Sequence, residues 1–196
     1  MARMLILDTS CKYMVVGVAS NEKIIYSTQI ECFQRQSEIA MDEVYKALEI
    51  TKTDPKKIDK VIVTIGPGSY TGIRIALTIA KVYCSTLNIP LVGVSTLRAM
   101  AGCRGKKIAL MDARSNRAYI GIYDGGDKVV EDAVLPLEEI KTLLESYKGY
   151  KLVGDTHLLG IDSNEIDFVK NLYEIGKNED GVVDCGNVNP IYLKDK

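Results

Sequence analysis

The sequence has no tryptophan, one histidine and no long hydrophobic run in 196 residues. With His157 as its one imidazole, the chain cannot build a two-histidine metal site, and a Ser-His-Asp triad would depend on that side chain alone. No Gly-x-Ser-x-Gly segment supports such a triad. No 18 successive residues are all apolar, so we expect a cytoplasmic protein that neither crosses a membrane nor is exported.

An excess of one charge and paired cysteines are also missing. The 25 basic and 26 acidic residues leave a formal net charge of −1, which argues against a protein that grips nucleic acid alone. The five cysteines are scattered, with no Cys-x-x-Cys spacing, so they predict reduced thiols and not a disulfide or zinc framework. The 46% hydrophobic content is typical of a globular protein with a core.

Hydrophobic periodicity predicts an alternating β and α order over the first hundred residues. Strands are expected at 5–8, 14–18, 24–30 and 61–65, and helices at 37–50 and 71–87. The second helix is apolar nearly all round, apart from a thin polar line of Arg74, Thr78, Lys81 and Ser85. Such a helix is covered on most sides. The chain itself or a second molecule could supply that cover, and the pattern does not choose between them.

A repeat with an offset of 104 residues divides the chain. Asp8 and Gly17 of the first β-unit correspond to Asp112 and Gly121 of a second one. The repeat predicts two lobes of related plan, a larger one over 1–103 and a smaller one over 104–196. A helix is expected at 136–147, a strand at 152–155 and a packed tail at 189–194, while 156–187 shows no clear order.

The residues at the ends of the predicted hairpins and in the glycine loop could contact a nucleotide. Glycines permit close backbone approach and a helix N-terminus favours an anion. The same residues read equally as turn and N-cap residues, in which case Asp8→Asn should cost about 1 kcal/mol or less. The candidates are Asp8, Thr9, Ser10, Gly66, Gly68, Ser69 and Asp112.

The run Gly66-Pro67-Gly68-Ser69-Tyr70-Thr71-Gly72-Ile73-Arg74 resembles the signature of the TsaB (YeaZ) family. Further segments agree with that family: Ile6-Leu7-Asp8-Thr9-Ser10, Gln36-Ser37-Glu38, Gly93-Val94-Ser95-Thr96-Leu97, Met111-Asp112-Ala113-Arg114 and Pro190-Ile191-Tyr192-Leu193. The agreement is dense up to about residue 123 and thin after it.

The resemblance implies a two-lobed α/β fold of the actin, Hsp70 and sugar-kinase type, a duplicated RNase H-like plan with central mixed sheets. It also implies a dimerisation scaffold, not an enzyme on its own, in the complex that makes threonylcarbamoyladenosine in tRNA. The catalytic paralogue TsaD carries His-x-x-x-His on its first helix. The matching positions are Gln36 and Ala40, which cannot bind a catalytic metal.

The partners implied by the resemblance are TsaD, bound through the first two helices, and the small ATPase TsaE. A homodimer is expected for the isolated chain, and tRNA is expected to be reached only through the complex. No metal and no tightly bound cofactor are expected, with ATP or ADP acting in the complex. The expected partner-binding residues are Met41, Val44, Tyr45, Leu48, Ile73, Leu77 and Lys81.

Two alternatives belong to other functional classes. The first is an actin-like ATP-binding protein or ATPase that uses Asp8 and Asp112. Release of phosphate from ATP by the purified chain would favour it. The second is a metallopeptidase, which the lack of a second histidine opposes.

Overall fold

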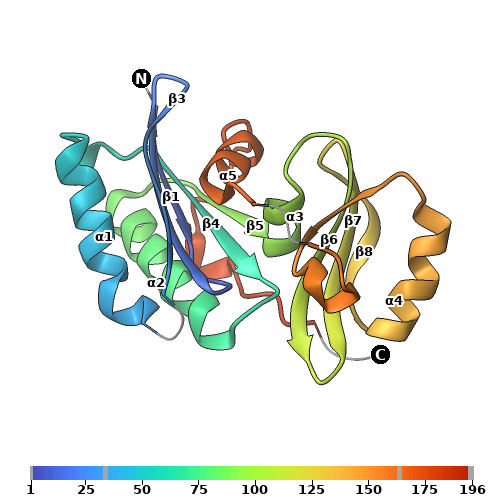
Figure 1. Cartoon of the computed structure of the whole chain (residues 1–196). Coiled ribbons are helices and arrows are strands. Elements are labelled where there is room, and N and C mark those ends of the chain that lie inside the picture. The colour runs from blue at the N-terminus through green and yellow to red at the C-terminus, as the bar shows by residue number, and fades with distance from the viewer. Residues whose placement is uncertain (1, 33–34, 163–164, 194–196) are drawn as a thin grey trace.

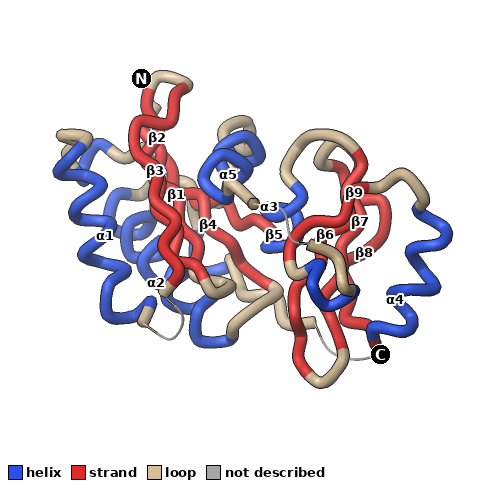
Figure 2. Tube along the Cα trace, in the orientation of Figure 1, coloured by secondary structure: helices blue, strands red, loops and turns tan. Residues whose placement is uncertain are grey.

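The computed structural model describes residues 2–32, 35–162 and 165–193, which form two lobes (Figures 1 and 2). Each lobe is built on one mixed β-sheet, of five strands in the first lobe and four in the second. The predicted two-lobed α/β architecture is therefore confirmed. No helix within the described ranges is long and apolar enough to cross a membrane.

The first sheet has the strand order β3-β2-β1-β4-β5. The first three strands form an antiparallel meander, and β4 and β5 run parallel to β1. Parallel neighbours need crossover connections, and the two predicted helices supply them. The elements are β1 (Arg3–Asp8), β2 (Tyr13–Ser20), β3 (Lys23–Glu31), α1 (Gln36–Ile50), the 3₁₀ turn η1 (Pro55–Lys57), β4 (Lys60–Gly66), α2 (Tyr70–Leu87) and β5 (Leu91–Ser95).

The second sheet repeats this plan with one strand fewer, in the order β8-β7-β6-β9. Three antiparallel strands are followed by a helix and a strand parallel to the first, so the predicted duplication is confirmed. The elements are β6 (Lys106–Arg114), β7 (Arg117–Asp124), β8 (Asp127–Pro136), α4 (Leu137–Leu144), the 3₁₀ turn η2 (Glu145–Tyr147) and β9 (Lys151–Gly154).

The first hairpins of the two lobes differ in register by one residue. Asp8 lies opposite Val15, whereas Asp112 lies opposite Ala118, so the second turn is one residue shorter. Residues 114–116 all have positive φ in that tighter turn. The glycines at the 104-residue offset are therefore not equivalent across the sheet, because Gly17 faces Ile6 and Gly121 faces Ala109.

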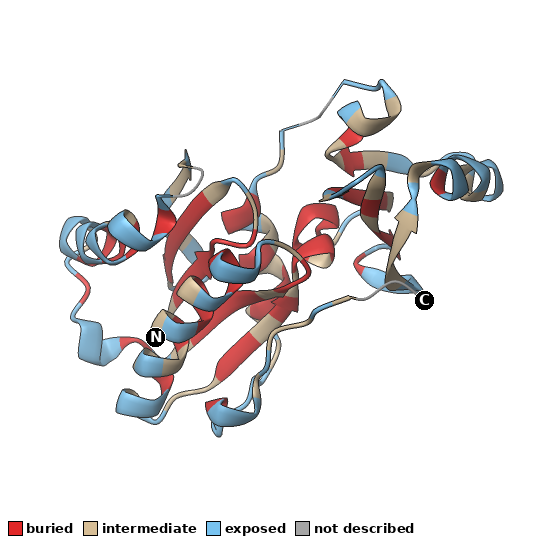
Figure 3. Ribbon diagram, turned by 90° about the horizontal axis from the view of Figure 1, so that it is seen from below, coloured by how far each residue is buried: buried red, intermediate tan, exposed pale blue. Residues whose placement is uncertain are grey.

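Alternation along β1 sends its side chains into two different cores. Leu5 and Leu7 pack under α1 and α2 on one face of the sheet. Ile6 packs on the other face with α3 (Thr96–Ala101) and α5 (Phe168–Gly176), a core that continues into the second sheet. A smaller core lies under α4. In Figure 3 the outer sides of α1 and α4 are exposed, and of the first sheet β1, β2 and β4 are mostly buried whereas the edge strand β3 is not.

The C-terminal segment returns to the first lobe, which differs from the expected boundary of a lobe over 104–196. Helix α5 contacts all five strands of the first sheet. Val182 bridges Leu91, and the Ile191 N–H donates to the Ile65 carbonyl at 2.7 Å. The physical reason is that the second face of the first sheet is apolar and needs a cover, which α5 supplies.

Within its described residues, the stretch that the sequence left without order contains η3 (Thr156–Leu159), α5 and η4 (Cys185–Asn187). Helix α5 begins where the Asp167 carboxylate accepts the Lys170 N–H at 2.9 Å, an ordinary N-cap. The expected packed tail is seen as far as Leu193, and its last residue, Lys194, lies outside the described residues.

Candidate functional site: the outer face of helices α1 and α2

Helices α1 and α2 lie side by side on one face of the first sheet (Figure 1). Their inner sides form the core under β1, β2 and β4. Ser69 caps the start of α2 by accepting the Gly72 N–H at 3.2 Å, and Asn88 ends it in the left-handed conformation. The outer sides of both helices therefore form one continuous surface of the first lobe.

Four of the seven predicted partner-binding residues are buried and cannot contact a partner. Val44 and Leu48 of α1 and Ile73 and Leu77 of α2 are each no more than 5% exposed. They point inward because i, i+4 spacing places each pair on one side of its helix, and that side faces the sheet. Assigning them to a partner surface was wrong: they support that surface from beneath.

The other predicted residues reach the surface. Met41 and Tyr45 have exposed fractions of 54% and 68%, which is high for such large apolar groups. Lys81 is half-buried, and its ammonium donates to the Gly186 carbonyl at 3.3 Å. Lys81 thus joins α2 to the C-terminal segment and lies at the margin of the exposed surface.

The exposed line along α2 is less polar than its sequence suggested. Tyr70, Arg74, Thr78 and Val82 follow one another at i, i+4 spacing, and all four are exposed. Tyr70 and Val82 are 57% and 58% exposed. Sequence reasoning missed both, because an aromatic residue in a signature loop and a valine in an apolar helix each read as interior.

Three polar contacts show how the two helices are oriented. Tyr26 of β3 donates to the Glu43 carboxylate at 3.4 Å, so the Glu43 flank of α1 faces the edge of the sheet and the Met41 flank faces α2. On α2, Arg74 and Lys81 bond the C-terminal segment, so their flank of the helix faces away from α1. Val82 lies on the outer side of α2, opposite its buried residues.

The tail adds an aromatic ring to this surface. Tyr192 stacks on Tyr70 with ring centroids 5.2 Å apart, and the Arg74 Nε donates to the Tyr192 hydroxyl at 2.9 Å. The Arg74 guanidinium also lies 4.2 Å from the centre of the Tyr70 ring. We call Met41, Tyr45, Tyr70, Arg74, Val82 and Tyr192 the α1–α2 face.

Asp8 caps the β1–β2 turn, as one interpretation of the sequence held, but it does so from a buried position. It is fully buried, and its Oδ1 accepts the Ser10 N–H at 2.9 Å and the Thr64 hydroxyl, while its Oδ2 lies 3.8 Å from the Cys11 thiol, a weak donor. Burial raises the pKa of the Asp8 carboxyl, and the hydrogen bonds from Ser10 and Thr64 oppose that shift. The carboxyl group is thus held inside the first lobe by its own chain.

The glycine loop packs against the β1–β2 turn. A Cβ at Gly68 would overlap the Ser10 carbonyl, and one at Gly72 would overlap the Thr9 carbonyl. The Thr9 hydroxyl donates to the Gly72 carbonyl at 2.5 Å and accepts the Ala76 N–H at 3.1 Å. This close approach between two backbone segments accounts for the glycines and anchors the start of α2.

Other contacts tie the loop to both ends of the chain. The Ser69 N–H donates to the Ser10 carbonyl at 2.7 Å, and a Cβ at Gly66 would overlap the Ile191 carbonyl. The Ser69 N–H, which a phosphate would need, is therefore already bonded to backbone, and Gly66 and Gly68 each face a backbone carbonyl. These contacts favour the structural interpretation of Thr9, Ser10, Gly66, Gly68 and Ser69 that the sequence had left open.

Asp112 differs from its counterpart in the first lobe. It is exposed, and its carboxylate accepts the Arg114 N–H at 2.7 Å within the turn. Its own N–H donates to the Asp155 carboxylate at 2.8 Å. Both aspartates therefore cap their turns, but their roles differ, because Asp8 is buried and also accepts the Thr64 hydroxyl whereas Asp112 is exposed.

Gln36 and Ala40, the two positions expected from the resemblance to match the metal-binding histidines of TsaD, are both buried. The Gln36 amide donates to the Cys11 carbonyl at 3.1 Å, linking the start of α1 to the first hairpin, and Ala40 packs in the interior. Across the described residues, no three His, Cys, Asp or Glu side chains are grouped as metal ligands would be.

A family model described as TsaD, tRNA N6-adenosine threonylcarbamoyltransferase, matches residues 30–152, more than half of the chain. The chain is 32% identical over 136 residues to the tRNA threonylcarbamoyladenosine biosynthesis protein TsaB of Bacillus subtilis, covering 66% of this chain and 58% of that protein. It is 28% identical over 163 residues to TsaB of Buchnera aphidicola from Schizaphis graminum, covering 77% of each.

Solved structures share the fold. One titled YeaZ from Pseudomonas aeruginosa superposes with a TM-score of 0.82 at 21% identity, covering 98% of this chain and all of that one. A second, described as similar to peptidase YeaZ of the same organism, gives a TM-score of 0.85 over 99% of this chain and all of its own. The predicted fold class is confirmed, and the chain belongs to the TsaB (YeaZ) family of tRNA threonylcarbamoyladenosine biosynthesis proteins.

Proposed function

We propose that this chain is a non-catalytic subunit that binds and activates a TsaD-type transferase through its α1–α2 face. The observation that carries the proposal is the exposure of Met41, Tyr45, Tyr70 and Val82 on two neighbouring helices. Large apolar side chains gathered on neighbouring helices are a kind of surface that soluble proteins usually cover. Tyrosine and arginine are also the residue types most enriched in the energetically dominant centres of protein interfaces.

The kind of partner follows from the family relationship. The match of residues 30–152 to the TsaD family model means that a TsaD-type protein shares the plan of this region, including α1 and α2. Such a partner offers equivalent helices, so the two faces can meet about a pseudo-twofold axis. The same geometry allows two copies of this chain to associate through identical faces when no partner is present.

The catalytic role falls to the partner because this chain lacks the groups for it. Gln36 and Ala40 occupy the positions of the metal ligands in TsaD, and Gln36 is engaged with the hairpin backbone. Asp8 is sequestered by Ser10 and Thr64. The proposal therefore holds that ATP or ADP acts elsewhere in the complex, which includes a TsaE-type ATPase, and that tRNA is reached through the assembled complex.

A reconstitution experiment tests this proposal. The purified chain alone should transfer no threonylcarbamoyl group to tRNA, and the TsaD of the same organism should gain activity when the chain is added in equal amount. Transfer is measured as threonylcarbamoyladenosine in digested tRNA by mass spectrometry. Transfer by this chain without TsaD would overturn the proposal, and so would a TsaD whose activity is the same with and without it.

The ATPase alternative is tested in the same preparation. If Asp8 and Asp112 served nucleotide hydrolysis, the chain alone would release phosphate from ATP, and Asp112→Asn would abolish this. Because the Asp8 carboxyl is fully engaged within the fold, we expect no release above the rate of a buffer control.

A further inference from the structure

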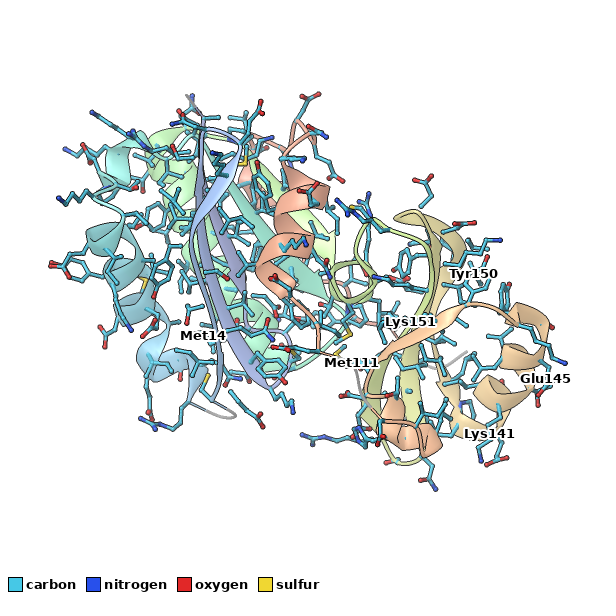
Figure 4. The ribbon with its side chains drawn as sticks, turned by 45° about the horizontal axis from the view of Figure 1, so that its top comes forward. Met14, Met111, Lys141, Glu145, Tyr150 and Lys151 are labelled. Atoms are coloured by element: carbon cyan, nitrogen blue, oxygen red, sulfur yellow. The ribbon has the colours of Figure 1, made fainter. Side chains whose placement is uncertain are left out.

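A cavity of about 280 Å³ lies between the two lobes, away from the α1–α2 face. Its wall comes from the end of α3, the loop after it, β6, β9, residues 165–167 and the first turns of α5. In Figure 1, α3 and α5 stand between the two sheets, and in Figure 4 Lys151 marks the border of the second lobe. Nothing in the role proposed above uses this cavity.

Four cations from separate elements line the cavity: Arg104 in the loop, Lys107 on β6, Lys151 on β9 and Lys170 on α5. Lys107 and Lys151 are direct neighbours in the parallel pairing of β6 with β9. Directly paired residues point to the same face of a sheet, so two ammonium groups are held close together. Like charges in such a pair are unfavourable unless something compensates them.

Three carboxylates also line the wall, those of Glu165, Asp167 and Glu174, but among the described residues none of them forms an ion pair with Lys107 or Lys151. Glu174 pairs with Lys177 at 2.8 Å, and Asp167 accepts the Lys170 backbone N–H as the cap of α5. Glu165 is the remaining carboxylate of the wall. Throughout the part of the chain that the structure describes, none of the four cations forms an ion pair with a carboxylate.

Lys107 is the less exposed of the two paired lysines. Its ammonium is half-buried and donates to the Ala101 carbonyl at 2.5 Å. Burial lowers the pKa of Lys107, and the neighbouring charge of Lys151 lowers it further. An anion placed between the two lysines would remove the repulsion and restore charge-assisted hydrogen bonds to both.

We propose that this inter-lobe cavity binds a small phosphoanion, held by Lys107 and Lys151 from the sheet and by Arg104 and Lys170 from its rim. Phosphate groups match this arrangement because arginine and lysine both bind phosphate oxygens strongly. The volume lies at the lower end of the range of about 300–1,000 Å³ for small-molecule sites, which suits pyrophosphate or the phosphates of a nucleotide. Because the site lies apart from the α1–α2 face, it does not depend on the partner proposed there.

Calorimetric titration of the full chain with pyrophosphate tests the site. The wild-type chain should bind one equivalent, and Lys151→Gln should weaken binding at least about tenfold. Glu165→Gln removes a competing negative charge and should tighten binding about threefold. Lys141→Gln is the matched control, since Lys141 is an exposed lysine of the same lobe that pairs with Glu138 at 2.7 Å. Thermal unfolding of each variant checks that it is folded.

Titrations with ADP and adenosine distinguish the sources of the phosphate. Tighter binding of ADP than of pyrophosphate would support the site and assign it to nucleotides, whereas equal or weaker binding would support it and assign it to a free phosphoanion. Absence of pyrophosphate binding to the wild type at 10-fold molar excess over about 1 mM protein would overturn the proposal. Equal losses in Lys141→Gln and Lys151→Gln would also overturn it, and so would adenosine binding that Lys151→Gln leaves unchanged.

Discussion

Met41→Asp should weaken association with a TsaD-type partner by at least about thirtyfold, or ~2 kcal/mol, while the chain remains folded. The side chain is more than half exposed and lies on the flank of α1 that faces α2, so an aspartate there is solvated in the free chain. In the complex the same carboxylate would be buried among apolar groups without a partner charge. The dissociation constant is measured by calorimetry with purified TsaD.

Tyr45→Asp should act in the same direction, since Tyr45 is one helical turn further along the same flank. The matched control is Val129→Asp, because Val129 is an exposed apolar residue on β8, in the other lobe. Leu48→Ala separates packing from binding: Leu48 is buried, so its truncation should lower the free energy of unfolding by about 2–4 kcal/mol. If Met41→Asp and Tyr45→Asp bind TsaD as tightly as Val129→Asp does, the partner surface is not the α1–α2 face.

Asp8→Ala should lower the free energy of unfolding by about 2–4 kcal/mol, whereas Asp8→Asn should cost about 1 kcal/mol or less. The alanine leaves the Thr64 hydroxyl and the Ser10 N–H buried without an acceptor. The asparagine keeps a carbonyl oxygen for both donors and is close to the same shape. Urea unfolding followed by circular dichroism measures the difference.

The stability of the fold should also depend on pH through Asp8, in the direction set by its pKa. Burial raises the pKa of Asp8 above its ordinary value of 3.8, so in the folded chain this group binds its proton more tightly than in the unfolded chain. The contribution of Asp8 to stability is therefore fully present below pH 3.8 and is lost as the pH rises to the folded-state pKa. Asp8→Asn should lack this loss.

Asp112→Ala is the matched control for Asp8→Ala in the duplicated hairpin. Its carboxylate is exposed and accepts one turn N–H, from Arg114, so its removal should cost about 1 kcal/mol or less. Equal destabilisation by Asp8→Ala and Asp112→Ala would contradict the unlike roles assigned to these two aspartates.

Much of the fold could be predicted from the sequence, because short local patterns indicate its strands and helices and because the same plan occurs in both lobes. Short apolar runs bounded by polar turns predicted β1 and β2, the helical period predicted α1 and α2, and the 104-residue repeat predicted a second lobe of the same plan. Each of these signals lies within a few consecutive residues or in a direct comparison of two segments. The one-residue shift between the hairpins was not visible, because it depends on the turn at 114–116.

The placement of α5 could not be read in the same way. The sequence left the region of α5 without clear order, and the apolar residues of a helix do not show which lobe buries it. The choice depended on the second face of the first sheet, formed by Ile6, Ile62 and other residues more than a hundred positions away. A pattern within one segment carries no information about which distant surface remains uncovered.

The candidate site also has some features that the sequence shows and others that only the structure shows. The sequence alone determined the family signature, the presence of one histidine in the whole chain, and two helices with apolar flanks. Only the tertiary structure decided that Val44 and Leu48 face inward while Met41 and Tyr45 face outward, and that Tyr192 stacks on Tyr70. It also brought Lys107 beside Lys151. The physical reason is that exposure and convergence are properties of long-range packing, whereas composition and periodicity describe only what each segment is able to bury.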